Sequence, residues 1–187
     1  MSTLEIEENF STRARPPDVL AFLLDPDKLV PCLPGAELEA VEDERVFRGR
    51  VKVQLGAVAI GYQGQIELTE VDEARGTLRA EGEGRERGGA GRVRVVLTGR
   101  VEPEEGGSRV SVHARVKLAG KIVRLGRGLI EAVAQELFSQ FAVAVREGVE
   151  ADSEGGSVAE PERPIRAFPL LLRSLWKWLR RFFRNAS

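Results

Sequence analysis

The chain has 187 residues, and its 28 Lys and Arg and 29 Asp and Glu give a net charge of −1. Its one cysteine, Cys32, excludes an internal disulfide bond, and the N-terminus lacks the basic and apolar regions of a secretory signal, so we expect a cytoplasmic protein. The near-neutral charge averages two unlike parts, because seven Lys and Arg but only one acid occur from Pro161 onward.

Three segments are expected along the chain. Residues 1–148 have the length of one ordinary domain with a sizeable core. Residues 149–166 are rich in Gly, Ser, Pro and acids and contain almost nothing large and apolar, which predicts a flexible linker. Residues 167–187 are basic and amphipathic, and we expect them to form a separate helix.

The domain is predicted to begin with a strand and two short helices. Leu4–Phe10 alternates apolar and polar residues, as half-buried strands do. Pro16 opens a short helix that ends before Pro26, and a second helical turn is expected at Asp27–Cys32.

Strand patterning dominates the middle of the chain, and a long helix follows it. Alternation with a period of two, together with Gly-rich turns, predicts strands at Phe47–Leu55, Val58–Leu68, Gly76–Arg87, Arg92–Glu102 and Arg109–Leu118. Apolar residues spaced by three and four predict a helix from Lys121 to Arg146. We therefore expect an α+β fold in which a curved antiparallel sheet of about seven strands wraps around the long C-terminal helix, an arrangement that tends to leave a lined cavity.

Apolar residues on the inner faces of the strands and of the long helix are the candidate ligand-binding residues. They are Val58, Ile60, Tyr62, Ile66, Val95, Leu97, Val112, Ala114, Val116, Leu129, Val133, Leu137 and Phe141. These side chains either fill the space as a close-packed core or line a retained cavity, and small residues on the same faces, such as Gly49 and Gly64, favour a cavity. The hydroxyl of Tyr62 either reaches the rim of this space or donates a hydrogen bond to a ligand.

Few residues suggest chemistry, and we expect no catalytic residue and no metal site. The only histidine, His113, lies on the outer face of its predicted strand, and the sequence lacks clustered His, Cys and carboxylate ligands. Cys32 has no histidine to activate it and is expected to be a small buried residue. Asp25 and Asp27 flank a helix break, where helix capping is their expected role.

Residues 167–187 predict an amphipathic helix that lies on the anionic inner leaflet of a membrane. Cations recur every three or four residues, and Leu, Trp and Phe fill the opposite arc. The predicted membrane-binding residues are Leu171, Arg173, Leu175, Trp176, Lys177, Trp178, Leu179, Arg180, Arg181, Phe182, Phe183 and Arg184. Charge at every turn argues against a bilayer span, and the separation of aromatics from cations argues against nucleic acid. The alternative is a helix that packs on its own domain or on a partner.

Three short motifs carry a resemblance to a known family. Cys32–Glu37, Arg48–Val53 and Leu125–Glu131 are similar to segments of the carbon monoxide dehydrogenase G-subunit family, which belongs to the START-like helix-grip (SRPBCC) superfamily. The resemblance covers about Thr3 to Arg146. It implies an accessory to the aerobic molybdenum enzyme that oxidises carbon monoxide at the cytoplasmic membrane, with a related molybdenum hydroxylase as the alternative partner.

These features lead to three hypotheses of different classes. In the first, the protein is a peripheral membrane protein that carries a hydrophobic small molecule, and the resemblance points to a non-covalently bound respiratory quinone such as menaquinone. In the second, it is a passive membrane anchor or assembly factor for the dehydrogenase, with a filled core. In the third, it is a helix-grip enzyme that acts on an apolar substrate.

Overall fold

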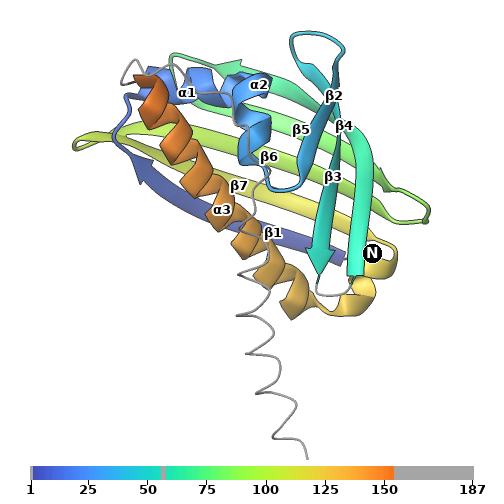
Figure 1. Ribbon diagram of the computed structural model, residues 1–187. Helices are drawn as coiled ribbons and strands as arrows, with labels where there is room; N and C mark the ends of the chain where they lie inside the picture. The colour runs from blue at the N-terminus through green and yellow to red at the C-terminus, as the bar shows by residue number, and fades with distance from the viewer. Residues whose placement is uncertain (1, 56–57, 154–187) are drawn as a thin grey trace, which may run out of the picture. The chain divides into compact units, whose positions relative to one another are not determined.

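A seven-stranded antiparallel sheet forms the frame of the domain, and the computed structural model describes residues 2–55 and 58–153 (Figure 1). The strands are β1 (Ser2–Thr12), β2 (Ala36–Val41), β3 (Val46–Leu55), β4 (Val58–Asp72), β5 (Thr77–Glu86), β6 (Arg92–Glu104) and β7 (Gly107–Ala119). They lie in the order β1, β7, β6, β5, β4, β3, β2. The helices are α1 (Pro16–Leu24), α2 (Pro26–Leu29), α3 (Arg127–Ser153) and the 3₁₀ turns η1 (Val30–Cys32) and η2 (Lys121–Leu125).

The α+β fold predicted from the sequence is confirmed, including the two short helices after the first strand and the long helix at the end. The pattern did not locate β2. This strand is six residues long, and a bulge between Leu38 and Ala40 shifts its register against β3. Most of its residues are exposed, because β2 lies at the edge of the sheet. Ala36, Leu38 and Ala40 do alternate with Glu37 and Glu39, but the run is short and contains two alanines, so its apolar pattern is weak.

The long helix begins and ends later than the sequence predicted. Gly126 has a φ of +85°, a backbone conformation that favours glycine, and it separates η2 from α3. At the other end, the Glu150 carboxylate accepts hydrogen bonds from the Arg13 amide at 2.9 Å and from the Thr12 hydroxyl at 3.0 Å. These bonds attach the last turns of α3 to the end of β1, so residues 149–153, predicted as the start of the linker, are helical.

Glycines that face the inside of the sheet allow neighbouring strands to approach closely. Gly49, Gly64 and Gly84 are directly opposite one another on β3, β4 and β5. A Cβ atom on Gly64 would overlap the carbonyl oxygen of Glu83, and a Cβ on Gly49 would lie 2.7 Å from the carbonyl oxygen of Glu37. The expectation that Gly49 and Gly64 leave space for a ligand is therefore wrong, because the backbone of the neighbouring strand occupies that space.

Two apolar cores lie toward opposite ends of α3. The first contains Phe10, Ala14, Val19, Leu20, Phe22, Cys32, Leu78, Val101, Val110, Ala142, Val145 and Val149, all of them buried. The rings of Phe138 and Phe141 lie 5.9 Å apart between centroids, and each lies 6.3 Å from the ring of Phe10. The second core, beside η2, contains Leu4, Ile60, Tyr62, Leu118, Ile122 and Ile130. Together the two cores hold both halves of α3 on the sheet through Ile130 at one end and Ala142, Val145 and Val149 at the other.

Candidate functional site

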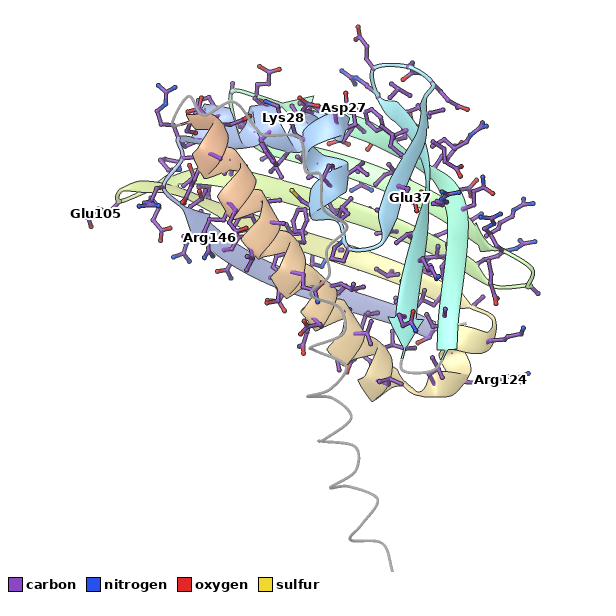
Figure 2. The ribbon with its side chains drawn as sticks, viewed as in Figure 1. Asp27, Lys28, Glu37, Glu105, Arg124 and Arg146 are labelled. Atoms are coloured by element: carbon purple, nitrogen blue, oxygen red, sulfur yellow. The ribbon has the colours of Figure 1, made fainter. Side chains whose placement is uncertain are left out.

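The helix α3 is attached to β1 along one of its flanks. Arg146, labelled in Figure 2, donates a hydrogen bond from Nε to the carbonyl oxygen of Ser11 at 3.0 Å. The Glu150 carboxylate accepts a hydrogen bond from the amide of Arg13, just after β1. At about 100° per residue, Val133 and Leu137 lie on the flank opposite Arg146. This second flank is the one that meets the short helices, since a Cβ on Gly148 would contact the ring of Phe22. Figure 1 shows α3 crossing the side of the sheet that carries α1 and α2.

Apolar side chains that belong to neither core lie between the two cores. On β6, Val95 stands between Val93, which packs on the second core, and Leu97, which packs on the first. Ile66 on β4 shares the inner face with Val95, and both side chains approach the position of a Cβ on Gly82, at 3.5 and 2.9 Å.

Partial exposure distinguishes these side chains from the cores. Ile66 is 38 % exposed, and Phe47, its neighbour on β3, is half-buried. Val133 and Leu137 on α3 are half-buried as well. We call Phe47, Ile66, Val95, Val133 and Leu137 the apolar strip. Their partial exposure makes these side chains candidates for contact with a partner or a ligand.

Tyr62 contributes a polar group at the second core. Its side chain is 5 % exposed, and its hydroxyl is the one buried side-chain polar atom among the described residues that has no hydrogen-bond partner. Burial raises the pKa of this hydroxyl, and the nearby Glu86 carboxylate raises it further. Tyr62 is therefore a neutral donor at physiological pH. A buried hydroxyl without a protein partner loses its hydration without compensation, so its partner must come from outside the described chain, as a water molecule or a ligand.

Comparison with known families decides the affiliation of the chain. The family model CoxG, which describes the G-subunit of carbon monoxide dehydrogenase, matches residues 9–150. The chain belongs to the CoxG family. No curated protein matches it in sequence.

Solved structures similar to this CoxG-family domain agree on its fold. A conserved protein from Geobacillus kaustophilus has a TM-score of 0.71 and 19 % identity, over 79 % of this chain and 95 % of its own. A protein from Thermus thermophilus has a TM-score of 0.59 and 23 % identity, over 80 % and 99 %. An aromatase/cyclase from Streptomyces sp. R1128 has a TM-score of 0.62 and 15 % identity, over 83 % and 100 %. At these identities the similarity concerns the fold alone.

The structure separates the predicted ligand-binding residues into three groups. Ile60 and Tyr62 belong to the second core, Val116 packs on it, and Ala114 is buried. Leu97, Val112 and Phe141 pack on the first core. Ile66, Val95, Val133 and Leu137 belong to the apolar strip, and Leu129 is 46 % exposed at the start of α3. The side chain of Val58 lies outside the described residues. The residues at the two ends are close-packed, whereas Ile66, Val95, Val133 and Leu137 are partly exposed.

One member of the apolar strip, Phe47, was not among the predicted site residues. The alternation of β3 assigned it to the inner face, but nothing in the sequence indicated that its neighbour would be Ile66. That pairing depends on the register between β3 and β4, which the hairpin between them sets.

Residues considered for chemistry have structural surroundings that match their expected roles. The thiol of Cys32 is buried, donates to the carbonyl oxygen of Lys28 at 3.5 Å, and has a pKa raised by burial. Asp25 accepts a hydrogen bond from the amide of Asp27 at 3.0 Å, which confirms its role as a helix cap. His113 is exposed on the outer face of β7. Within residues 2–55 and 58–153, no group of three or more His, Cys, Asp and Glu is placed to hold a metal ion.

Two features bear on the membrane. By length and composition α3 is apolar enough to cross a bilayer. We assign it to the domain, because Ile130, Ala142, Val145 and Val149 are buried in the two cores. The predicted membrane-binding residues from Leu171 to Arg184 lie outside the described residues.

Proposed function

We propose that the protein is a membrane-tethered carrier of an apolar ligand, a respiratory quinone of the menaquinone type, and that it serves an aerobic molybdenum carbon monoxide dehydrogenase. The observation that carries this proposal is the buried hydroxyl of Tyr62, which has no hydrogen-bond partner among the described residues. Partly exposed apolar side chains on the same inner face of the sheet, such as Ile66, support it. Family membership supports the partner, since the family is named for a component of carbon monoxide dehydrogenase.

The chemistry of a quinone suits both features. Its ring carbonyl oxygens accept hydrogen bonds, and a neutral phenol is a donor for such an oxygen. Its isoprenoid chain is apolar and gains free energy on leaving water for the apolar strip, at about 0.8 kcal/mol for each buried CH₂ group. The donor therefore selects the head group and the strip accommodates the chain. The proposal assigns no bond-breaking step to the protein.

The tether comes from the sequence. Residues 167–187 have the composition of a helix that binds an anionic membrane surface by charge and by apolar burial, so the domain is expected on the cytoplasmic face of the membrane. A quinone is dissolved in that membrane, and the dehydrogenase is expected in the cytoplasm beside it. A tethered domain with an apolar surface connects the two.

Ligand retention tests the proposal. The full chain is loaded with excess menaquinone and passed through gel filtration, and the retained quinone is extracted and measured. We expect Leu137→Asn to reduce retention at least fivefold, because the amide adds a polar group to the apolar strip. Val143→Asn is the matched control, since Val143 is 47 % exposed on the same helix and lies off the strip. A wild-type chain that retains no menaquinone contradicts the proposal.

A shortened linker separates a carrier from a passive anchor. Deletion of residues 154–161 leaves α3 complete, including the pair between Asp152 and Lys28. A carrier must turn between membrane and dehydrogenase, so quinone reduction slows, whereas an anchor needs only co-localisation and is unaffected. Normal carbon monoxide dependent respiration in this variant, with the dehydrogenase still at the membrane, favours the anchor.

A further inference from the structure

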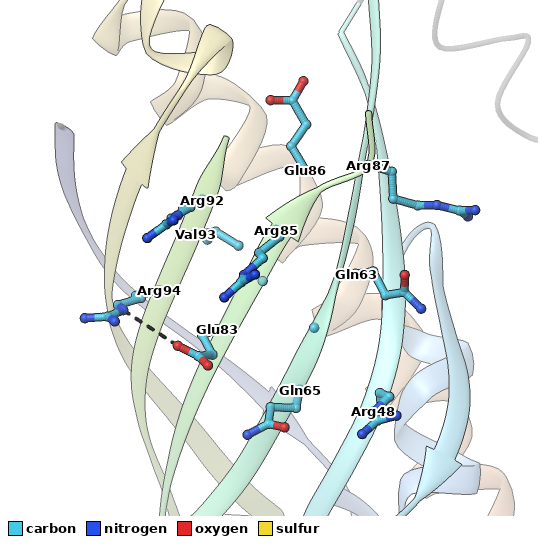
Figure 3. Close-up of a pocket in the computed structure, with 12 residues that line it drawn as sticks. Arg48, Gln63, Gln65, Glu83, Arg85, Glu86, Arg87, Arg92, Val93 and Arg94 are labelled. Atoms are coloured by element: carbon cyan, nitrogen blue, oxygen red, sulfur yellow. Dashed lines mark ion pairs between the residues drawn. The ribbon is translucent and has the colours of Figure 1, made fainter. Parts of the chain in front are cut away.

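The outer face of the sheet carries a groove whose twelve lining residues include five arginines (Figure 3). Its volume is about 660 Å³, and it lies over β3 to β6 on the face opposite the apolar strip. We call Arg48, Arg85, Arg87, Arg92 and Arg94 the arginine groove. The remaining polar side chains that line it are Gln63, Gln65, Glu83 and Glu86.

The strand register brings like charges together in this groove. Arg85 on β5 is directly opposite Arg92 on β6, and Arg94 is directly opposite Lys117 on β7. Like charges in such cross-strand positions destabilise a sheet. Elsewhere on the same face arginines are opposite carboxylates, as Arg115 is opposite Glu5 at 2.9 Å.

Two arginines of the groove have carboxylate partners. Arg94 lies 3.8 Å from Glu83, a long ion pair shown by the dashed line in Figure 3. Arg48 pairs with Glu42, which follows β2 and is not part of the lining.

Arg85 and Arg92 keep their charge unneutralised. Glu86, the other carboxylate of the lining, accepts a hydrogen bond from the amide of Gly91 at 3.0 Å, which directs it to the hairpin turn. Within the described part of the chain, Arg85 and Arg92 have no ion pair. The domain thus holds uncompensated positive charge at a concave site, at a cost to its own stability.

The chemistry of the lining indicates phosphate groups as the occupant. Guanidinium groups bind phosphate oxygens in pairs through parallel N–H donors, and the amides of Gln63 and Gln65 add further donors. The volume falls within the range of sites that hold molecules the size of a head group, roughly 300–1,000 Å³, and exceeds the needs of one phosphate ion.

A lipid surface accounts for this lining better than a protein partner does. Protein interfaces draw most of their affinity from aromatic and apolar anchors. Val93 is the one apolar side chain in the lining of this groove. Binding to anionic lipid needs only clustered cations. The 34 residues that follow Ser153 include the predicted membrane helix, which would hold the domain close to such a surface.

We propose that the arginine groove binds the phosphate groups of anionic lipids and forms a second membrane contact, on the domain itself. The tail restrains the position of the domain, and the groove restrains its orientation, with the outer face of β4, β5 and β6 toward the membrane. This inference concerns the outer face and does not depend on a ligand at the apolar strip.

Vesicle binding of the full chain tests the groove. The double variant Arg85→Gln/Arg92→Gln is compared with the wild type on vesicles of equal parts phosphatidylglycerol and phosphatidylcholine. At low salt we expect the apparent Kd to rise about 30-fold, because each cation contributes about a factor of five near an anionic surface. High salt removes most of this difference. On pure phosphatidylcholine the two proteins bind equally.

The matched control is Arg100→Gln/Arg109→Gln, which removes the same charge from outer-face arginines that pair with Glu102 at 3.1 Å and Glu104 at 2.6 Å. An equal loss of vesicle binding in both double variants means a net-charge effect and overturns the proposal. Equal vesicle binding by the groove variant and the wild type overturns it as well. The same holds if the groove variant loses binding to the intact dehydrogenase but keeps its binding to vesicles. Calorimetric binding of inorganic phosphate to the groove without any effect on vesicles assigns the site to a free anion instead.

Discussion

Replacing Tyr62 by Phe should move the stability of the free domain and its ligand affinity in opposite directions. The wild-type hydroxyl is buried without a partner, so its desolvation is uncompensated in the ligand-free state. Removing it is expected to raise the free energy of unfolding by about 1 to 3 kcal/mol. In the complex, the same change removes one hydrogen bond, whose net contribution of about 0.5 to 1.5 kcal/mol corresponds to a loss of roughly 2- to 13-fold in affinity.

Two measurements check this prediction. Urea unfolding of the ligand-free full chain gives the stability, and equilibrium dialysis with a short-chain menaquinone gives the affinity. Ile60→Val is the control, because Ile60 lies in the same core and the change should cost about 0.5 to 1.5 kcal/mol of stability without reducing affinity. A Tyr62→Phe variant that is less stable than wild type and binds menaquinone equally well would refute the reasoning, since the hydroxyl would then be used within the domain.

Three further predictions concern the frame and the tail. Hydrogen bonds from the Arg13 amide and side chain lower the pKa of Glu150 to about 2, so its contribution to stability is complete above the unfolded-state pKa near 4.3 and is lost as the pH falls toward 2. Glu150→Gln should therefore lower the free energy of unfolding at pH 7, with the difference from wild type shrinking across that range in urea titrations. Gly64→Ala should lower the free energy of unfolding by about 1 to 3 kcal/mol, because its Cβ meets the backbone of β5. Gly61→Ala should change thermal stability little, because nothing lies within 4 Å of a Cβ there. Trp176→Ala/Trp178→Ala should weaken flotation with anionic vesicles even at high salt, where the basic face is screened, and unchanged flotation would contradict a membrane helix.

Elements and their faces followed from the sequence alone. Strands with a period of two and a helix with a period of 3.6 are local properties, and the alternation of β4 correctly assigned Ile60, Tyr62 and Ile66 to one face. The same local rules explain why Pro16 begins α1 and why Asp25 caps α2. Even the edge strand β2 was missed for a local reason, since its alternating run is short and carries only one large apolar residue, Leu38, before Val41.

Depth and pairing were decided by the tertiary structure. Tyr62 is enclosed and Ile66 is 38 % exposed although both point to the same side, because α3 and the short helices cover some rows of the sheet and leave others open. The two like-charged pairs of the outer face arise only when β5, β6 and β7 are aligned, and that alignment depends on hairpin geometry. Alternation along a strand specifies the face of a side chain, whereas burial and neighbours depend on contacts between segments far apart in the chain. The candidate ligand-binding surface and the arginine groove are both made of such contacts, so only the folded chain reveals them.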